Sequence, residues 1–223
     1  MKDRAEALIA QRLAYEFLGT IFWEAPCEEL VRRLVAEDLL VDWPFPSGDP
    51  DLEAGLGRMR ASCREGAPGL VAALAEDHAR LLVTPGEEFV RPWESVHRGE
   101  EHVLFDRETL EVEREYHRFG MSVPRPGVEP GDHLALELRF LAHLCALALA
   151  AIEREQHDAL SRVTEAMGQF VQGHLERWAG ECLRQLAENA GTEFYRGAAQ
   201  VARACLAETA RILSAWRAEA PGA

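Results

Sequence analysis

The sequence predicts an all-α protein, a single-domain bundle of about eight to ten helices over residues 1–223. Apolar residues recur every three or four positions along most of the chain, and sustained alternation of apolar and polar residues is rare. Hydrophobic residues make up 48% of the chain, which is enough to bury a sizeable core at this length. Prolines and glycines interrupt the pattern in three segments, 41–50, 84–105 and 120–131.

The N-terminal third contains four helical patterns. The first helix ends before Pro26 and carries apolar residues four positions apart, namely Ile9, Leu13, Phe17 and Ile21. Leu8, Leu18 and Phe22 widen this apolar stripe. The second runs from about Pro26 to Leu39, and the loop at 41–50 follows it. Two shorter patterns occupy 52–59 and 70–82.

The middle of the chain contains two irregular connections. From 84 to 105 the helical pattern fails, which predicts a loop of about 20 residues, a length that is often functional. Helix resumes over 109–119. The segment 120–131 is then expected to act as a hinge between N-terminal and C-terminal helical parts, and its last residues are Glu129, Pro130 and Gly131.

The strongest helical pattern follows this hinge, over 134–152. Its apolar run, 140–152, is shorter than the 18 to 20 residues or so that span a bilayer, and it contains His143. We therefore expect a buried core helix. Further helical patterns continue to Gly191, and a last helix covers 194–216.

Charge and composition argue against several classes of protein. The formal net charge is −14 and there is no basic stripe, so nucleic acid is not an expected partner. Charged residues interrupt the N-terminus, which excludes a secretory signal and predicts a cytoplasmic protein. Of the five scattered cysteines, Cys145 and Cys205 lie in apolar surroundings, as expected for buried free thiols.

Enzyme motifs are not found in the sequence. There is no Gly-x-Ser-x-Gly elbow, phosphate-binding loop or dinucleotide fingerprint. The one Glu-x-x-His element, from Glu94 to His97, is expected in the proline-rich loop, and His133 with Glu137 would give only two ligands for a metal. The sequence therefore favours a binding protein over a catalyst.

The densest cluster of polar and special residues lies at 128–144. Asp132 can cap the following helix by accepting hydrogen bonds from its free N–H groups, after a turn set by Pro130 and Gly131. This structural role is the preferred interpretation of the spacing alone. A functional alternative is that Asp132 and His133 form the edge of a peptide groove beside the tryptophan-bearing loop.

The run from Glu129 to Phe140 resembles a family signature. Glu129-Pro-Gly-Asp-His133 followed by Leu-Ala-Leu-Glu-Leu-x-Phe140 is similar to the E-P-x-D-H-x-x-x-E-L-x-F motif of the TorD/DmsD family of redox-enzyme maturation chaperones, which is related to NarJ. Other similar segments occur in the expected order: Tyr15-Glu-Phe-Leu18, Leu81 to Gly86, Arg91-Pro-Trp-Glu-Ser-Val96, Tyr116 to Gly120, and Trp178 with Phe194-Tyr195.

The resemblance implies a cytoplasmic, all-helical chaperone and not an enzyme. The family binds the twin-arginine signal region of a molybdenum-containing oxidoreductase subunit. It holds the apo-subunit until molybdopterin guanine dinucleotide is inserted, and so delays export through the Tat translocon. This cofactor belongs to the client, and the chaperone itself is expected to bind none tightly.

The resemblance also assigns signal-peptide-binding residues. Asp132 and His133 match the motif positions tied to leader binding. The facing loop is represented by Trp93, Glu94 and Ser95, and the first helix by Tyr15 and Leu18.

Two positions depart from the family pattern. Gly131 stands where an acidic residue or proline is usual and is expected to loosen the hinge, and Arg139 replaces an acidic residue. Both departures leave the identity of the client open.

The chemistry of a twin-arginine leader assigns a role to each group. Asp132 is expected to form a bidentate pair with an arginine, with little effect of Asp132→Ala on stability. His133 is expected to hold the same edge and to respond to protonation near pH 6 to 7. The remaining apolar contacts would come from Trp93, Tyr15 and Leu18.

Three other functions remain open at this stage. They are a NarJ-type assembly chaperone for a non-exported nitrate reductase subunit, a helical metal or cofactor-binding enzyme, and an oligomeric scaffold. The hinge between strong helices makes either a monomer or a helix-exchanged homodimer possible.

Overall fold

The computed structural model describes residues 1–45, 48–64, 69–99 and 102–219, and these residues contain helices but no β-strand. The all-α class is therefore confirmed. In chain order the helices are α1 (Lys2–Trp23), α2 (Glu28–Ala36), α3 (Pro50–Arg64), α4 (Leu70–His78) with the π-helical turn η1 (Ala79–Val83), α5 (Glu94–Arg98), α6 (Arg107–Arg118), α7 (Leu134–Glu153), α8 (His157–Phe170), the π-helical turn η2 (Val171–Leu175), α9 (Glu176–Asn189) and α10 (Glu193–Ala218).

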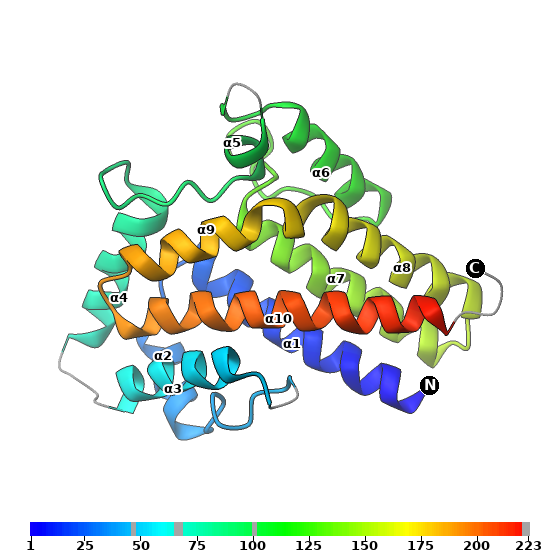
Figure 1. Ribbon diagram of the computed structural model, residues 1–223, viewed down its shortest axis with the longest axis horizontal. Coiled ribbons are helices and arrows are strands. Elements are labelled where there is room, and N and C mark those ends of the chain that lie inside the picture. Colours follow the sequence, from blue (N-terminus) through cyan, green and yellow to red (C-terminus); the bar gives the residue numbers. More distant parts are fainter. Residues whose placement is uncertain (46–47, 65–68, 100–101, 220–223) are drawn as a thin grey trace.

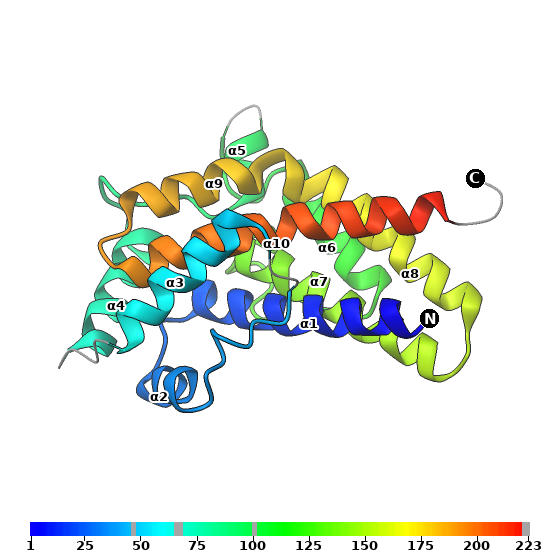
Figure 2. The ribbon, with the colours of Figure 1, turned by 60° about the horizontal axis from the view of Figure 1, so that its bottom comes forward.

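Two long helix pairs form the centre of the bundle. Helix α1 packs along α7, while α10 crosses the front of Figure 1 and packs against α3 on one side and α9 on the other. Figure 2 shows α1 and α10 in separate layers, with α2 outside them. Helices α5 and α6 lie at one edge of the bundle, above α9 and α7 in Figure 1.

Helix α7 is the predicted core helix. In length and apolar composition it could cross a membrane, but 61% of its apolar window is buried inside the protein. Cys145 on this helix and Cys205 on α10 are buried free thiols, as expected from the sequence. Burial raises the pKa of both thiols, so they remain protonated.

The predicted apolar stripe of α1 is partly wrong. Ile9 and Leu13 are 47% and 52% exposed, whereas Leu8, Leu18 and Phe22 are buried as expected, and Gln11 and Tyr15 share their buried face. The reason is the 3.6-residue turn. A strict spacing of four advances around the helix by about 40° per step, whereas alternating steps of three and four stay on one face.

The segment predicted as a loop, 84–105, is more regular than expected over its described residues, 84–99 and 102–105, while 100 and 101 lie outside them. It contains the short helix α5, so the Glu94–His97 element lies on a helix and not in a loop. Asp132, a residue distant in sequence, supplies the side chain that accepts from the first turn of this helix. The periodicity of 84–105 alone could not reveal this helix.

A pair of glycines allows α3 and α10 to cross closely. A Cβ atom at Gly197 would lie 2.4 Å from the carbonyl oxygen of Gly55, and a Cβ at Gly55 would lie 2.8 Å from that of Gly197. Both obstacles are backbone atoms, so neither can move aside as a flexible side chain could.

Gly197→Ala is therefore expected to destabilise the fold by about 1–3 kcal/mol, because the new methyl group forces the two helices apart. Thermal unfolding followed by circular dichroism measures the effect. Gly180→Ala on α9 is the matched control: it faces open space, and better helix propensity should raise its stability slightly. Equal melting temperatures for the two variants would contradict this account of the crossing.

Candidate functional site

The two segments predicted to face one another are joined by backbone hydrogen bonds. Trp93 and His133 form an isolated antiparallel bridge. The Glu94 N–H donates to the Asp132 carbonyl (3.0 Å), and the Leu134 N–H donates to the Pro92 carbonyl (2.8 Å). The Arg91–Val96 and Glu129–His133 motifs thus meet directly, as the resemblance implied.

Asp132 holds this junction from inside. Its carboxylate has no exposed surface, and it accepts from the Ser95 N–H (2.7 Å) and from the Thr109 hydroxyl (2.9 Å). Asp132 therefore caps α5 and ties it to α6. Burial raises the pKa of Asp132, although its hydrogen bonds to Ser95 and Thr109 lower it.

Two expectations about Asp132 are corrected by this geometry. It does not cap α7, because the capping residue there is His133, whose Nδ1 accepts from the Ala135 N–H (3.1 Å). Its carboxylate is also not open to an arginine of a leader, because both oxygens are occupied by hydrogen bonds beneath the surface.

His133 lies between two indole rings. The centroid of Trp23 is 5.2 Å from the imidazole and that of Trp93 is 5.6 Å away, both edge-on. Burial lowers the pKa of His133 to about 3, and the nearby His78 and Arg139 add to this shift. His133 is therefore neutral near pH 6 to 7, and the expectation that it responds to protonation there is wrong.

Of the three loop residues predicted to bind the leader, Trp93, Glu94 and Ser95, only Trp93 keeps accessible surface. It is half-buried, and its indole N–H has no hydrogen-bond partner among the described residues. Glu94 is fully buried and pairs with Arg98 and with His174 (2.8 Å to Nδ1). Ser95 is fully buried too, and its role here is the N–H that binds Asp132.

Tyr15 and Leu18 lie in the core and not on a surface. Both side chains are completely buried. The Tyr15 hydroxyl is within 2.6 Å of Thr209 Oγ1 and donates to the Cys205 carbonyl at 3.1 Å, so it ties α1 to α10. The sequence could not separate these two residues from surface ones, because the resemblance places them on α1 without giving its rotation.

The predicted hinge is anchored at its C-terminal end. Pro130 and Gly131 are buried, and the Tyr116 hydroxyl donates to the Gly131 carbonyl (2.9 Å). A Cβ at Gly131 would lie 2.5 Å from Glu113 Cγ, so the glycine allows close packing here. Glu129 is half-buried and pairs with Arg125 (3.1 Å). Hinge motion of 120–131 stays a prediction.

Glu137 is a position of the family signature that the sequence analysis considered individually only as a metal ligand, and the structure gives it a structural role. It is fully buried, accepts a 3.4 Å hydrogen bond from the Trp178 indole N–H, and leaves its second oxygen unpaired. Burial raises its pKa well above the ordinary value, and the charges of Glu94 and Asp132 add to this. Burial therefore favours the protonated, neutral form of the Glu137 carboxyl group. Two signals in the sequence mark Glu137: its place in the signature and its position between Leu136 and Leu138.

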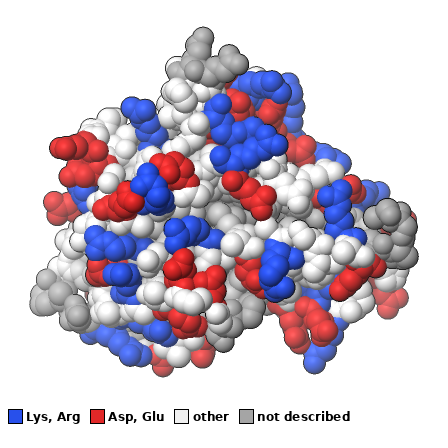
Figure 3. Space-filling model, viewed as in Figure 1, with Lys and Arg blue, Asp and Glu red and all other residues white. Residues whose placement is uncertain are grey.

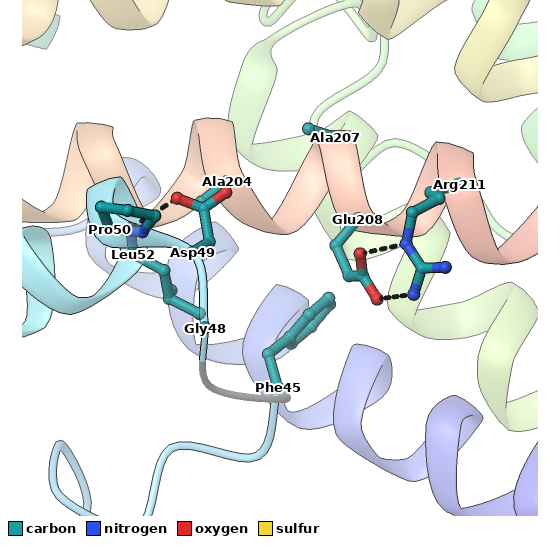
Figure 4. A pocket seen from close by; sticks show the side chains of 9 residues that line it. All are labelled: Phe45, Gly48, Asp49, Pro50, Leu52, Ala204, Ala207, Glu208 and Arg211. Atoms are coloured by element: carbon teal, nitrogen blue, oxygen red, sulfur yellow. Dashed lines mark hydrogen bonds and ion pairs between the residues drawn. The ribbon is translucent and has the colours of Figure 1, made fainter.

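A separate cavity of about 570 Å³ lies between the segment before α3 and the outer face of α10. Figure 4 shows that Glu208 faces Arg211, with which it pairs at 2.5 Å, and that Asp49 is turned toward the start of α3. Asp49 accepts there from the Asp51 N–H (2.8 Å). The polar groups of the cavity thus already have partners, and none of its lining residues belongs to the signature.

The charge distribution gives no sign of a polyanion site on the face shown in Figure 3. Acidic and basic side chains are interspersed there. Many are adjacent pairs on one helix, such as Arg184 with Glu181 and Glu188. Solvent screens such exposed pairs, and because the two signs are mixed they do not create a steering field.

Comparisons with known proteins identify the family. Residues 46–184 match the family described as nitrate reductase delta subunit. The chain belongs to this family, which includes the TorD and NarJ chaperones. Its curated relatives are named chaperones and not enzymes, and the chain is therefore a member of a chaperone family.

The relatives are distant in sequence. The chaperone protein TorD of Vibrio parahaemolyticus is 28% identical over 63% of this chain and 64% of its own length. TorD of Shewanella pealeana is 22% identical over 84% and 82%, and TorD of Vibrio cholerae is 27% identical over 63% and 62%. The match to the two Vibrio proteins thus spans less than two thirds of their length.

Asp132→Ala is expected to lower the free energy of unfolding by about 1–3 kcal/mol, because it leaves two buried donors unpaired and removes the cap of α5. Urea unfolding checks this, with the exposed Asp42→Ala as control, for which about 0.5 kcal/mol or less is expected. Wild-type stability in Asp132→Ala would show that the junction does not depend on this carboxylate.

Glu137→Gln is expected to reduce the pH dependence of stability. The raised pKa means that the folded state holds a proton that the unfolded chain releases above its ordinary pKa of 4.5. This stabilisation is complete below that pH and is lost as pH rises toward the folded pKa. Melting temperatures at pH 5 and pH 8 should therefore differ less in Glu137→Gln than in wild type or in the exposed Glu153→Gln. An unchanged pH profile would contradict a neutral Glu137.

Proposed function

We propose that this protein is a cytoplasmic redox-enzyme maturation chaperone that binds the twin-arginine signal region of an apo molybdenum oxidoreductase subunit. Binding supports insertion of molybdopterin guanine dinucleotide into the client and delays its export by the Tat pathway. The observation that carries the proposal is the junction of the two family motifs at Trp93 and His133.

The junction presents aromatic surface suited to an apolar leader. Trp23, Phe89 and Trp93 are all half-buried, and the Phe89 and Trp93 rings lie 6.1 Å apart. His133 lies between the two tryptophans and fixes their separation. Half-buried indoles can contact both the apolar and the polar parts of a peptide.

The energetics favour contact through this surface over a single ion pair. Burying about 500 Å² of apolar area is worth roughly 12 kcal/mol before costs, whereas an exposed ion pair contributes about 0.2–1 kcal/mol. The conformational entropy lost when a flexible leader becomes ordered offsets much of this free energy, so a net affinity in the micromolar to nanomolar range is expected.

Calorimetric titration with a synthetic twin-arginine leader tests the proposal. Trp93→Ala should weaken binding by about 10- to 100-fold, as for a central aromatic contact. Trp216→Ala is the matched control, because this half-buried tryptophan lies at the far end of α10, over Arg4. Raising salt should weaken binding only modestly, whereas polar substitutions in the apolar stretch of the leader should abolish it.

Two results would overturn the proposal. One is absence of leader binding by folded wild-type protein. The other is a steep salt dependence combined with insensitivity to the apolar stretch. Circular dichroism of Trp93→Ala separates a lost contact from a lost fold, because Trp93 also packs on His133.

A second candidate is a NarJ-type chaperone for a non-exported nitrate reductase subunit. The description of the matched family, nitrate reductase delta subunit, favours it. Titration with an N-terminal segment that lacks paired arginines discriminates the two, since only the NarJ-type chaperone should bind it tightly. Light scattering during the same work measures whether the protein is a monomer or a homodimer.

A further inference from the structure

Arg139 lies next to the junction without a conventional partner. Its guanidinium carbon is 5.8 Å from the centroid of the Trp23 ring. The side chain is half-buried, and among the described residues it takes part in no hydrogen bond or ion pair. Its position depends on the close approach of α1 and α7, because a Cβ at Gly19 would lie 2.7 Å from Arg139 Cγ.

The C-terminal end of α1 is suited to a cation. Trp23 offers a ring face, and the exposed Glu24 beside it has no ion pair among the described residues. The last turn of α1 contains no basic residue, so no side chain of this helix compensates the negative end of its dipole. Burial lowers the pKa of the Arg139 guanidinium, and the negative charge of Glu24 opposes this shift.

An aromatic face and a carboxylate are two means by which proteins bind a guanidinium group, and Trp23 and Glu24 supply one of each. Arg139 shows how such a group lies on Trp23. It is held there loosely, since no hydrogen bond fixes its guanidinium among the described residues. Another arginine with better access to Glu24 could take its place without disturbing the core.

We propose that Trp23 and Glu24 form an arginine-binding site at the end of α1, that Arg139 occupies this site in the free protein, and that an arginine of the leader displaces it. The inference rests on the proposed function for the source of the arginine. Glu24 takes the place of Asp132 as the carboxylate expected to bind the leader's positive charge, because Glu24 is exposed and Asp132 is buried.

The site makes two variants change affinity in opposite directions. Arg139→Met keeps the stem that packs on Gly19 but removes the internal competitor, so a paired-arginine leader should bind about 3- to 5-fold more tightly. Glu24→Gln removes the carboxylate and should weaken binding by about tenfold. Arg154→Met and Glu53→Gln are the matched controls, on the other end of α7 and on α3.

Calorimetry with the paired-arginine leader and a lysine-substituted leader reads out these effects. The lysine-substituted leader should not bind Arg139→Met more tightly than wild type, because an ammonium group is a compact charge without the planar fork of a guanidinium. If Arg139→Met binds the arginine leader no better than wild type, or if Glu24→Gln matches Glu53→Gln, the inference is overturned even though the leader binds.

A leader-independent probe separates this inference from the proposed function. Methylguanidinium is titrated while the Trp23 indole N–H resonance is followed by NMR. Arg139→Met should saturate at a lower concentration than wild type, and adding Glu24→Gln should reverse this gain. That result supports the site even where no leader binds. Identical responses of Arg139→Met and wild type would overturn the site even where the leader binds.

Discussion

The arrangement of the site depends on the buried carboxylate of Asp132. Its two oxygens bind the Ser95 N–H and the Thr109 hydroxyl, and so connect α5, α6 and the start of α7. Burying a carboxylate is costly unless its oxygens are hydrogen-bonded, which explains why both are used. Asp132 therefore fixes the position of Trp93 next to His133, and this indirect role is its contribution to the proposed peptide site.

The fold was predictable because helical periodicity is a local property. The core helix α7 and the all-α class followed from the spacing of apolar residues alone. The rotation of α1 was predictable only in part, because the wide apolar stripe contained both the buried Leu18 and the exposed Leu13. The close crossing of Gly55 and Gly197 was also missed, because it depends on two backbones far apart in sequence.

The sequence predicted which segments form the site better than it predicted what each residue does there. The motifs around Trp93 and His133 do meet, as the resemblance implied. Exposure could not be predicted, because burial of Asp132, Tyr15 and Leu18 depends on tertiary packing. Neither Glu24 nor Trp23 belongs to the recognised signature. Their relevance follows from the tertiary contacts of Trp23 with His133 and Arg139.

We expect a leader to bind to the surface formed by Trp23, Glu24 and Trp93, and not to the buried carboxylate of Asp132. A crystal structure of the protein with a twin-arginine leader tests this most directly. We expect both hydrogen bonds of the Asp132 carboxylate to persist, with a leader guanidinium over Trp23 and beside Glu24. An Asp132 carboxylate released from Ser95 and Thr109 and paired with a leader arginine would contradict the account.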